Sequence, residues 1–140
     1  MSAVNPIIGE WIYLAQMDYE SAQILSVSRL RPPIEVVCYH CQQSVEKIFK
    51  GYIAANGEIP ARTHDLTALI DTCKQYLPDF GNYAKPCNAL TMYASDTRYP
   101  PKLSLSETDM KQALQNAGEI LEFTKSKLKD LGYEYTPEQA

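Results

Sequence analysis

The sequence predicts an all-α fold, an antiparallel up-and-down bundle of about five helices. Apolar residues recur with the 3.6-residue period of an amphipathic helix in five successive segments. No segment shows the alternation of apolar and polar residues that is typical of a half-buried strand. The connections between segments are short, and no repeat or glycine-rich linker divides the chain. We therefore expect one helical domain over residues 1–140, with its core at about residues 7–131 and a flexible tail over residues 133–140.

The two N-terminal segments are predicted to be long helices. The first is expected over residues 7–28 and ends before Arg31-Pro32-Pro33. The second is expected over residues 34–55 and is closed by Asn56-Gly57, a typical signal of a helix C-terminus. The predicted apolar stripe of the first helix is Ile7, Trp11, Leu14, Ala15, Asp18, Ala22 and Leu25, and that of the second is Ile34, Val37, Cys41, Val45, Ile48 and Tyr52.

Three further helices are expected in the second half of the chain. A short third helix follows a capping residue, Thr63 or Asp65, and ends at Pro78. A fourth helical pattern over residues 80–94 contains Pro86, which either starts the helix or kinks it. The fifth helix opens with the capping box Ser106-x-x-Asp109 and stops at Gly132.

Composition and charge exclude several classes of protein. The 140 residues are enough for one hydrophobic core, with about two-thirds of the unfolded surface buried on folding. The net charge of −4 argues against a protein that binds duplex nucleic acid non-specifically through its whole surface. No apolar run approaches the roughly 20 residues of a membrane span. Residues 1–6 lack the features of a signal peptide, so we expect a cytoplasmic protein.

The four cysteines are expected to be free thiols. Cys38 and Cys41 form a C-x-x-C pattern, which can bind zinc or carry out redox chemistry. The pattern lies within an apolar periodic segment, and no second C-x-x-C or H-x-x-x-H accompanies it. Core packing is therefore the expected role, and no metal or cofactor is expected.

Asp18 interrupts the predicted apolar stripe of the first helix. A carboxylate in such a position is costly unless it is paired or hydrogen-bonded. We therefore expect Asp18 within hydrogen-bond reach of a side chain from another helix, with Lys47, Tyr99 and Arg98 as the candidates. The carboxylate either fixes the register of the helices or lies at the mouth of a cleft.

A polar row on the second helix lies nearly opposite its apolar stripe. The row comprises His40, Gln43, Lys47 and Lys50, within an arc of about 80°. Two ammonium groups, an imidazole and an amide suit contact with a phosphate or an anionic partner. Glu46 lies at the edge of the row, where it can pair with Lys50. The row is either a ligand site or a solvated or dimer-facing surface.

Two loop clusters supply further candidates. His64 and Asp65 precede a helix N-terminus, where backbone N–H groups favour anions. Helix capping by Thr63 or Asp65 is the expected role of this cluster, and an anion site is the alternative. Arg98 and Tyr99 follow the fourth helix, where Arg98 either caps terminal carbonyls or reaches an anion.

Three motifs occur in a fixed order along the chain. They are Tyr39-His40-Cys41-Gln42-Gln43-Ser44-Val45-Glu46-Lys47-Ile48-Phe49-Lys50-Gly51-Tyr52, then Pro60-x-x-Thr63-His64-Asp65-Leu66, then Asp96-Thr97-Arg98-Tyr99-Pro100. Together they resemble the HEPN family, the higher eukaryotes and prokaryotes nucleotide-binding domain. The opening Trp11-x-x-x-Ala15-x-x-Asp18-x-x-x-Ala22 is also similar to the first helix of that family, and the resemblance covers about residues 8–127.

The resemblance implies an up-and-down helical bundle that is usually dimeric. It also implies nucleotide binding and, in toxin–antitoxin-like pairs, a small nucleotidyltransferase as a partner protein. Many members are RNase toxins with an Arg-x(4–6)-His motif at the dimer interface. This sequence departs from that motif, because no histidine follows Arg98 and Arg62 precedes His64 by only two positions. It resembles instead the branch whose late motif reads Arg-Tyr-Pro.

The leading prediction is a non-catalytic homodimeric module that binds a nucleotide or RNA, with a nucleotidyltransferase as a further partner. In this reading the lysines and the arginine hold phosphates, and the tyrosine stacks on a base. A second prediction is a pure dimerisation or protein-interaction module, and a third is an RNase that uses one of the two histidines as acid or base. The predicted ligand-binding residues are His40, Gln43, Lys47, Lys50, Arg98 and Tyr99, supported by Asp18, Glu46, His64 and Asp65.

Overall fold

The computed structural model describes residues 5–134. Within this range there are five α-helices, two short 3₁₀ helices and no strand, which confirms the predicted all-α fold class. Most of residues 133–140, the predicted tail, lies outside the described residues. The elements are α1 (Pro6–Ser26), α2 (Ile34–Ala55), α3 (Leu66–Tyr76), η1 (Pro78–Tyr83), α4 (Ala84–Leu90), η2 (Thr91–Ala94) and α5 (Glu107–Asp130).

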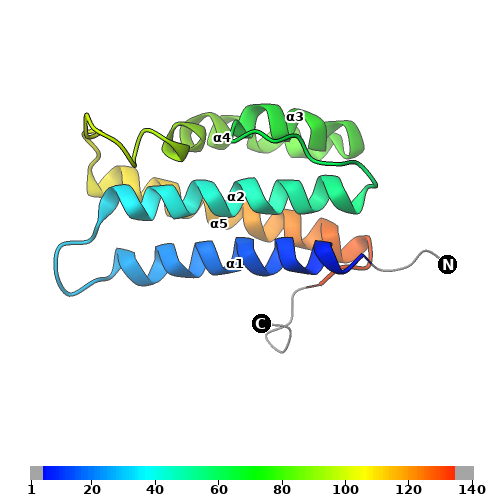
Figure 1. Ribbon diagram of the computed structural model, residues 1–140, viewed down its shortest axis with the longest axis horizontal. Helices are drawn as coiled ribbons and strands as arrows, with labels where there is room; N and C mark the ends of the chain where they lie inside the picture. The colour runs from blue at the N-terminus through cyan, green and yellow to red at the C-terminus, as the bar shows by residue number, and fades with distance from the viewer. Residues whose placement is uncertain (1–4, 135–140) are drawn as a thin grey trace.

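The three long helices α1, α2 and α5 lie along the long axis of the molecule, and α1 runs in the direction opposite to α2 and α5 (Figure 1). The second of them, α2, is central, because it contacts α1, α3, α4, η2 and α5. The shorter helices α3 and α4 lie on the side of α2 that faces away from α1 (Figure 1). This arrangement makes α2 the element against which side chains from the rest of the bundle converge.

Local signals in the sequence fix the helix ends. The Asn5 side chain accepts a hydrogen bond of 3.0 Å from the backbone N–H of Ile7 at the start of α1. Ser106 and Asp109 form the predicted capping box at the start of α5. Gly57, with φ +88°, follows the end of α2 in the left-handed conformation that glycine adopts without strain.

The fourth predicted segment is divided into η1, α4 and η2. Pro86 lies in the first turn of α4, where its missing N–H has no intrahelical partner to lose. Of the two alternatives for this proline, the structure therefore shows a helix start. The second predicted helix has the same bounds as α2.

The predicted apolar stripe of the first helix is partly wrong. Ile7 and Leu14 are exposed, whereas Ile8 and Ile12 are buried in the core. The reason is that α1 carries apolar residues on more than one face, and the bundle buries the face that also brings Tyr19 to the Leu114 carbonyl of α5, at 3.0 Å. Because the buried face of α1 differs from the predicted one, Asp18 lies at the edge of that face and not at its centre.

The four cysteines, including the C-x-x-C pair, are buried free thiols, as core packing requires. Burial raises the pKa of Cys38 to about 11 and that of Cys87 to about 12. These thiols are thus held in the protonated form, which is a poor nucleophile and a poor metal ligand. No helix within residues 5–134 is both long enough and apolar enough to cross a membrane.

Candidate functional site

Asp18 of α1 forms an ion-pair cluster with two residues of α2. Its Oδ2 lies 2.5 Å from Nζ of Lys47, and its Oδ1 lies 2.9 Å from Nδ1 of His40. The Asp18 side chain is only 13% exposed. The expectation of a partner from another helix is confirmed for Lys47, and His40 is a second partner that the desolvation argument did not identify.

Close packing of α1 on α2 places these three side chains together. The Ser44 hydroxyl of α2 donates a hydrogen bond of 2.8 Å to the carbonyl of Ala15. A Cβ at Gly51 would lie 2.9 Å from Cβ of Trp11, so this position of α2 requires glycine unless the helices separate. With both contacts made, Asp18 is held within reach of α2.

Glu46 forms a second cluster on α2. Its side chain is 6% exposed, and its Oε1 accepts from Nε2 of Gln42 at 3.2 Å. Nδ1 of His64 lies 2.9 Å from the same oxygen, and Nζ of Lys50 lies 3.1 Å from Oε2. The predicted pair with Lys50 is confirmed. The bond to His64 ties the loop after α2 to the middle of that helix.

The charged form of Glu46 is favoured in spite of its burial. Desolvation raises the pKa of this carboxyl, but the hydrogen bonds from His64, Gln42 and Lys50 lower it, together with the charge of Lys50. The net effect is a pKa below the ordinary value of 4.5. Glu46 is therefore an ionised, fully bonded group near neutral pH.

Gln42 and Gln43 extend the second cluster. Gln42 is fully buried, and its Nε2 also donates a hydrogen bond of 3.0 Å to the backbone carbonyl of His64. Its Oε1 accepts a bond of 2.7 Å from Nε2 of Gln43. Gln43 thus serves this internal network, and Gln42, which the sequence did not single out, anchors His64 through the backbone.

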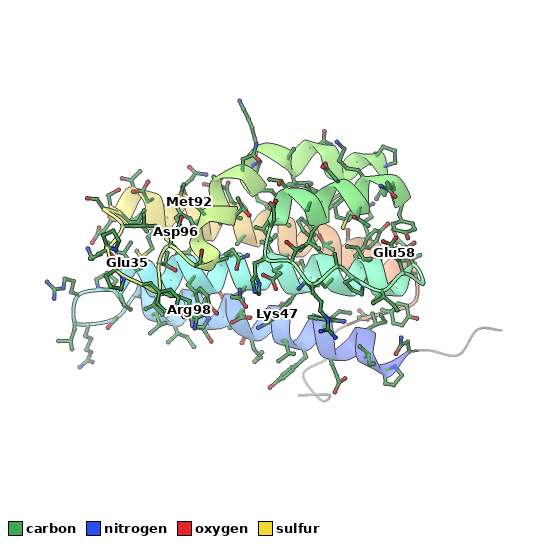
Figure 2. All side chains as sticks on the ribbon, turned by 45° about the horizontal axis from the view of Figure 1, so that its top comes forward. Glu35, Lys47, Glu58, Met92, Asp96 and Arg98 are labelled. Carbon is green, nitrogen blue, oxygen red and sulfur yellow. The ribbon has the colours of Figure 1, made fainter. Side chains whose placement is uncertain are left out.

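Arg98 approaches α2 from the loop before α5. Its guanidinium lies 5.2 Å from the ring centroid of Tyr39 and 5.6 Å from that of Tyr99. Figure 2 shows Arg98 over the first half of α2 and Lys47 farther along it, both on the side next to α1. Tyr39 in turn contacts His40 edge to face, with centroids 5.8 Å apart. Arg98 is therefore linked to the Asp18 cluster through Tyr39 and His40.

The three cations predicted to hold phosphates differ in whether an acidic side chain already pairs with them. Lys47 and Lys50 are neutralised by Asp18 and Glu46. Arg98 makes no ion pair with any residue between 5 and 134. In the described part of the chain, the cation of this surface that is free to meet an anion is thus Arg98.

Asp65 is a helix cap. Its carboxylate accepts from the backbone N–H and the hydroxyl of Thr67, at 2.9 and 2.6 Å. The same hydrogen bonds lower its pKa. Both bonds are accepted by Oδ1, so Asp65 has the capping role that was the structural alternative for this residue.

Two other features of the described residues lie outside this surface. A cavity of about 570 Å³ is lined by the first turns of α1 and by residues 132–134, and none of the predicted site residues lines it. No group of three or more histidines, cysteines or carboxylates in residues 5–134 is placed to hold a metal ion.

Tyr39 and Gln42 are the site residues that sequence reasoning missed. Both are adjacent to predicted ones, and Gln42 has the i, i+4 spacing to Glu46 that allows their hydrogen bond. This spacing could have identified Gln42 from the sequence as a partner of Glu46. The stacking of Arg98 on Tyr39 depends on the path of a loop, for which the sequence carries no periodic signal.

Comparison with known proteins gives a consistent result. The family model of the HEPN domain matches residues 8–128. The crystal structure of TT1696 from Thermus thermophilus superposes with a TM-score of 0.71 at 23% identity, covering 86% of this chain and 97% of that one. ST0689, described as an archaeal HEPN homologue, superposes with a TM-score of 0.69 at 24% identity, covering 86% and 96%. No curated protein matches. Because this family model matches most of the length of the chain, the chain belongs to the HEPN family.

Proposed function

We propose that this chain is a non-catalytic module that binds a nucleotide or RNA beside the first half of α2. The observation that carries the proposal is the environment of Arg98. Its guanidinium lies over two tyrosine rings and has no carboxylate partner among residues 5–134. A planar cation held in this way can donate two parallel hydrogen bonds to a phosphate.

Tyr99 supplies the second element of recognition. It is 64% exposed, so a face of its ring is available to a base, and stacking on tyrosine tolerates any base. His40 and Lys47 lie next along the same surface, where the ammonium of Lys47 has three N–H donors to share between Asp18 and a ligand anion. Membership of the HEPN family supports the ligand class. It also supports the homodimer and a small nucleotidyltransferase as the protein partner that we propose.

Titration calorimetry with the four ribonucleoside triphosphates and a short single-stranded RNA tests the proposal. Arg98→Gln should weaken binding about 10-fold, or about 1.4 kcal/mol. Arg29→Gln is the matched control, because Arg29 is also exposed but lies in the loop between α1 and α2. Added salt should weaken binding as well, since exposed cation–phosphate pairs are screened over about 8–10 Å. Equal affinities for the two variants, or no binding of any probe, would reject the proposal.

The interaction-module alternative is supported by a specific observation. Two of the three cations proposed for phosphate are already paired within the chain, Lys47 with Asp18 and Lys50 with Glu46. If no nucleotide or RNA binds while a nucleotidyltransferase encoded beside this chain does, the surface serves protein contacts.

The geometry of the two histidines supports the RNase alternative. In each case Nδ1 faces a carboxylate, Asp18 for His40 and Glu46 for His64. Because a carboxylate can only accept, Nδ1 carries the proton and Nε2 is left as the reactive atom. Cleavage of RNA that disappears in His40→Ala or His64→Ala would favour this alternative over the non-catalytic module.

A further inference from the structure

The cavity between the start of α1 and the end of α5 is separate from the surface around Arg98. Its volume is about 570 Å³, which lies within the roughly 300–1,000 Å³ of small-molecule sites. Figure 1 shows the start of α1 beside the end of α5. We refer to this space as the α1–α5 cavity. Its walls include two glycines, two tyrosines and two glutamates, which are Gly9, Gly132, Tyr13, Tyr133, Glu10 and Glu134.

The end of α5 fixes one wall of the cavity. Gly132 has φ +95°, a left-handed conformation that glycine adopts without strain, and its backbone N–H donates to the carbonyl of Lys129 at 2.9 Å. The N–H of Tyr133 donates to the carbonyl of Leu128, also at 2.9 Å. These two bonds form a Schellman motif, which turns the chain back at the end of the helix. The half-buried Tyr133 is thereby packed against the core as part of the cavity wall.

The uncompensated charge on the cavity wall is negative. Glu10 makes no ion pair with any residue between 5 and 134. Glu134 lies 3.5 Å from Nζ of Lys129, but both side chains are more than half exposed, so this pair is weak. Among residues 5–134, no lysine, arginine or histidine lines the cavity. The cavity wall therefore favours a cation.

The start of α1 does not offset this preference. A helix N-terminus ordinarily attracts anions through its free backbone N–H groups. Pro6, the first residue of α1, has no N–H to offer. The N–H groups of Ile7 and Ile8 donate to the side chain and the carbonyl of Asn5, at 3.0 and 3.1 Å. The first donors of the helix are thus already bonded within the chain.

We propose that the α1–α5 cavity binds an aliphatic diamine or polyamine. One ammonium group of such a ligand meets the carboxylate of Glu10, and another replaces Lys129 at Glu134. The methylene chain lies against the two tyrosine rings, which also attract a cation. Gly9 leaves room for the chain, because an added Cβ there would meet no atom within 4 Å. This site is independent of the nucleotide or RNA site proposed at Arg98.

Titration calorimetry of the full chain with cadaverine, a five-carbon diamine, tests the charge preference. Cadaverine should bind saturably, and the uncharged diol of the same length should not. Glu10→Gln should weaken cadaverine binding about 10-fold, or about 1.4 kcal/mol. Glu107→Gln is the matched control, because Glu107 is also exposed but lies at the opposite end of α5; its affinity should equal that of the wild type.

Gly9→Leu tests the cavity itself. The added side chain has room in the fold, and leucine is a better helix former than glycine, so Tm should not fall. Leucine should occupy the cavity and abolish cadaverine binding, whereas Gly9→Ala should retain it, because a single methyl group fills little of the space.

Binding of nucleotide or RNA should be the same in Gly9→Leu as in the wild type, so the two proposed sites succeed or fail separately. Three results would overturn the diamine site. They are no saturable binding of cadaverine, equal binding of the diol, and wild-type affinity for cadaverine in Gly9→Leu.

Discussion

Replacement of Glu46 by glutamine probes the most buried charge in the described part of the polar surface. Glutamine keeps the shape of the side chain and one acceptor oxygen, but it removes the charge that neutralises Lys50. That lysine is itself only 12% exposed and lies 3.1 Å from the carboxylate. Removing one partner of a buried pair is costly, because the other charge then lacks compensation.

The expected loss is about 2 kcal/mol in the free energy of unfolding. Removing one partner of a fully buried pair costs about 3–5 kcal/mol in the free energy of unfolding. The lower figure follows because His64 is largely exposed and because glutamine can still accept one hydrogen bond. For a chain of this length, such a loss lowers Tm by about 7 °C.

Urea and thermal unfolding, followed by circular dichroism, measure this loss. Glu122→Gln is the control, because Glu122 pairs with Lys125 at 3.0 Å but is 71% exposed; its cost should be about 0.5 kcal/mol or less. Lys50→Met should cost less in the Glu46→Gln background than in the wild type, since the partner charge is already absent. If Glu46→Gln and Glu122→Gln unfold with the same free energy, the reasoning about the buried pair is wrong.

Further predictions concern pH, thiols and helix capping. Because the pKa of Glu46 is lowered in the fold, its charge stabilises the protein at neutral pH. This contribution is lost as the pH falls from 4.5 through the lower pKa of the folded state. The difference in the free energy of unfolding between wild type and Glu46→Gln should therefore shrink in acid. Burial raises the pKa of Cys38 to about 11, and the other thiols are buried too, so a thiol reagent should modify none of the four in the native protein and all of them in denaturant. Ser106→Ala removes the oxygen that accepts from the backbone N–H of Asp109 at 3.2 Å and should cost about 1 kcal/mol in urea unfolding. Lys47→Met should lower Tm even without a ligand, because Asp18 would then have only His40 as a partner among residues 5–134, and an unchanged Tm would contradict that role.

The helices were predictable where independent signals coincide. For α2 the apolar period, the prolines before it and Asn56-Gly57 after it all agree, and the predicted bounds are those observed. For α1 the period shows that a helix forms but not which face the core takes. The sequence offers Ile7 and Leu14 as readily as Ile8 and Ile12, and only the contacts with α2 and α5 decide between them.

The candidate site was predictable in part for a related reason. The cost of burying a lone carboxylate is a local property, so a partner for Asp18 could be expected from α1 alone, and Lys47 is that partner. The bond between His64 and Glu46 depends on how residues 56–65 return along α2, and the position of Arg98 depends on the loop before α5. Neither loop carries a periodic pattern from which its path could be derived.

We propose that a phosphate-bearing ligand binds at Arg98 beside α2. The most direct measurement is NMR chemical-shift mapping of the ¹⁵N-labelled full chain during titration with a ribonucleoside triphosphate and with a short single-stranded RNA. We expect at least one probe to produce saturable shifts at the Arg98 Nε–H and at the amides of Tyr39, His40 and Tyr99, and we expect Arg98→Gln to remove them. Saturable shifts confined to other residues, such as those that line the cavity at the start of α1, or no shifts with either probe, would contradict it.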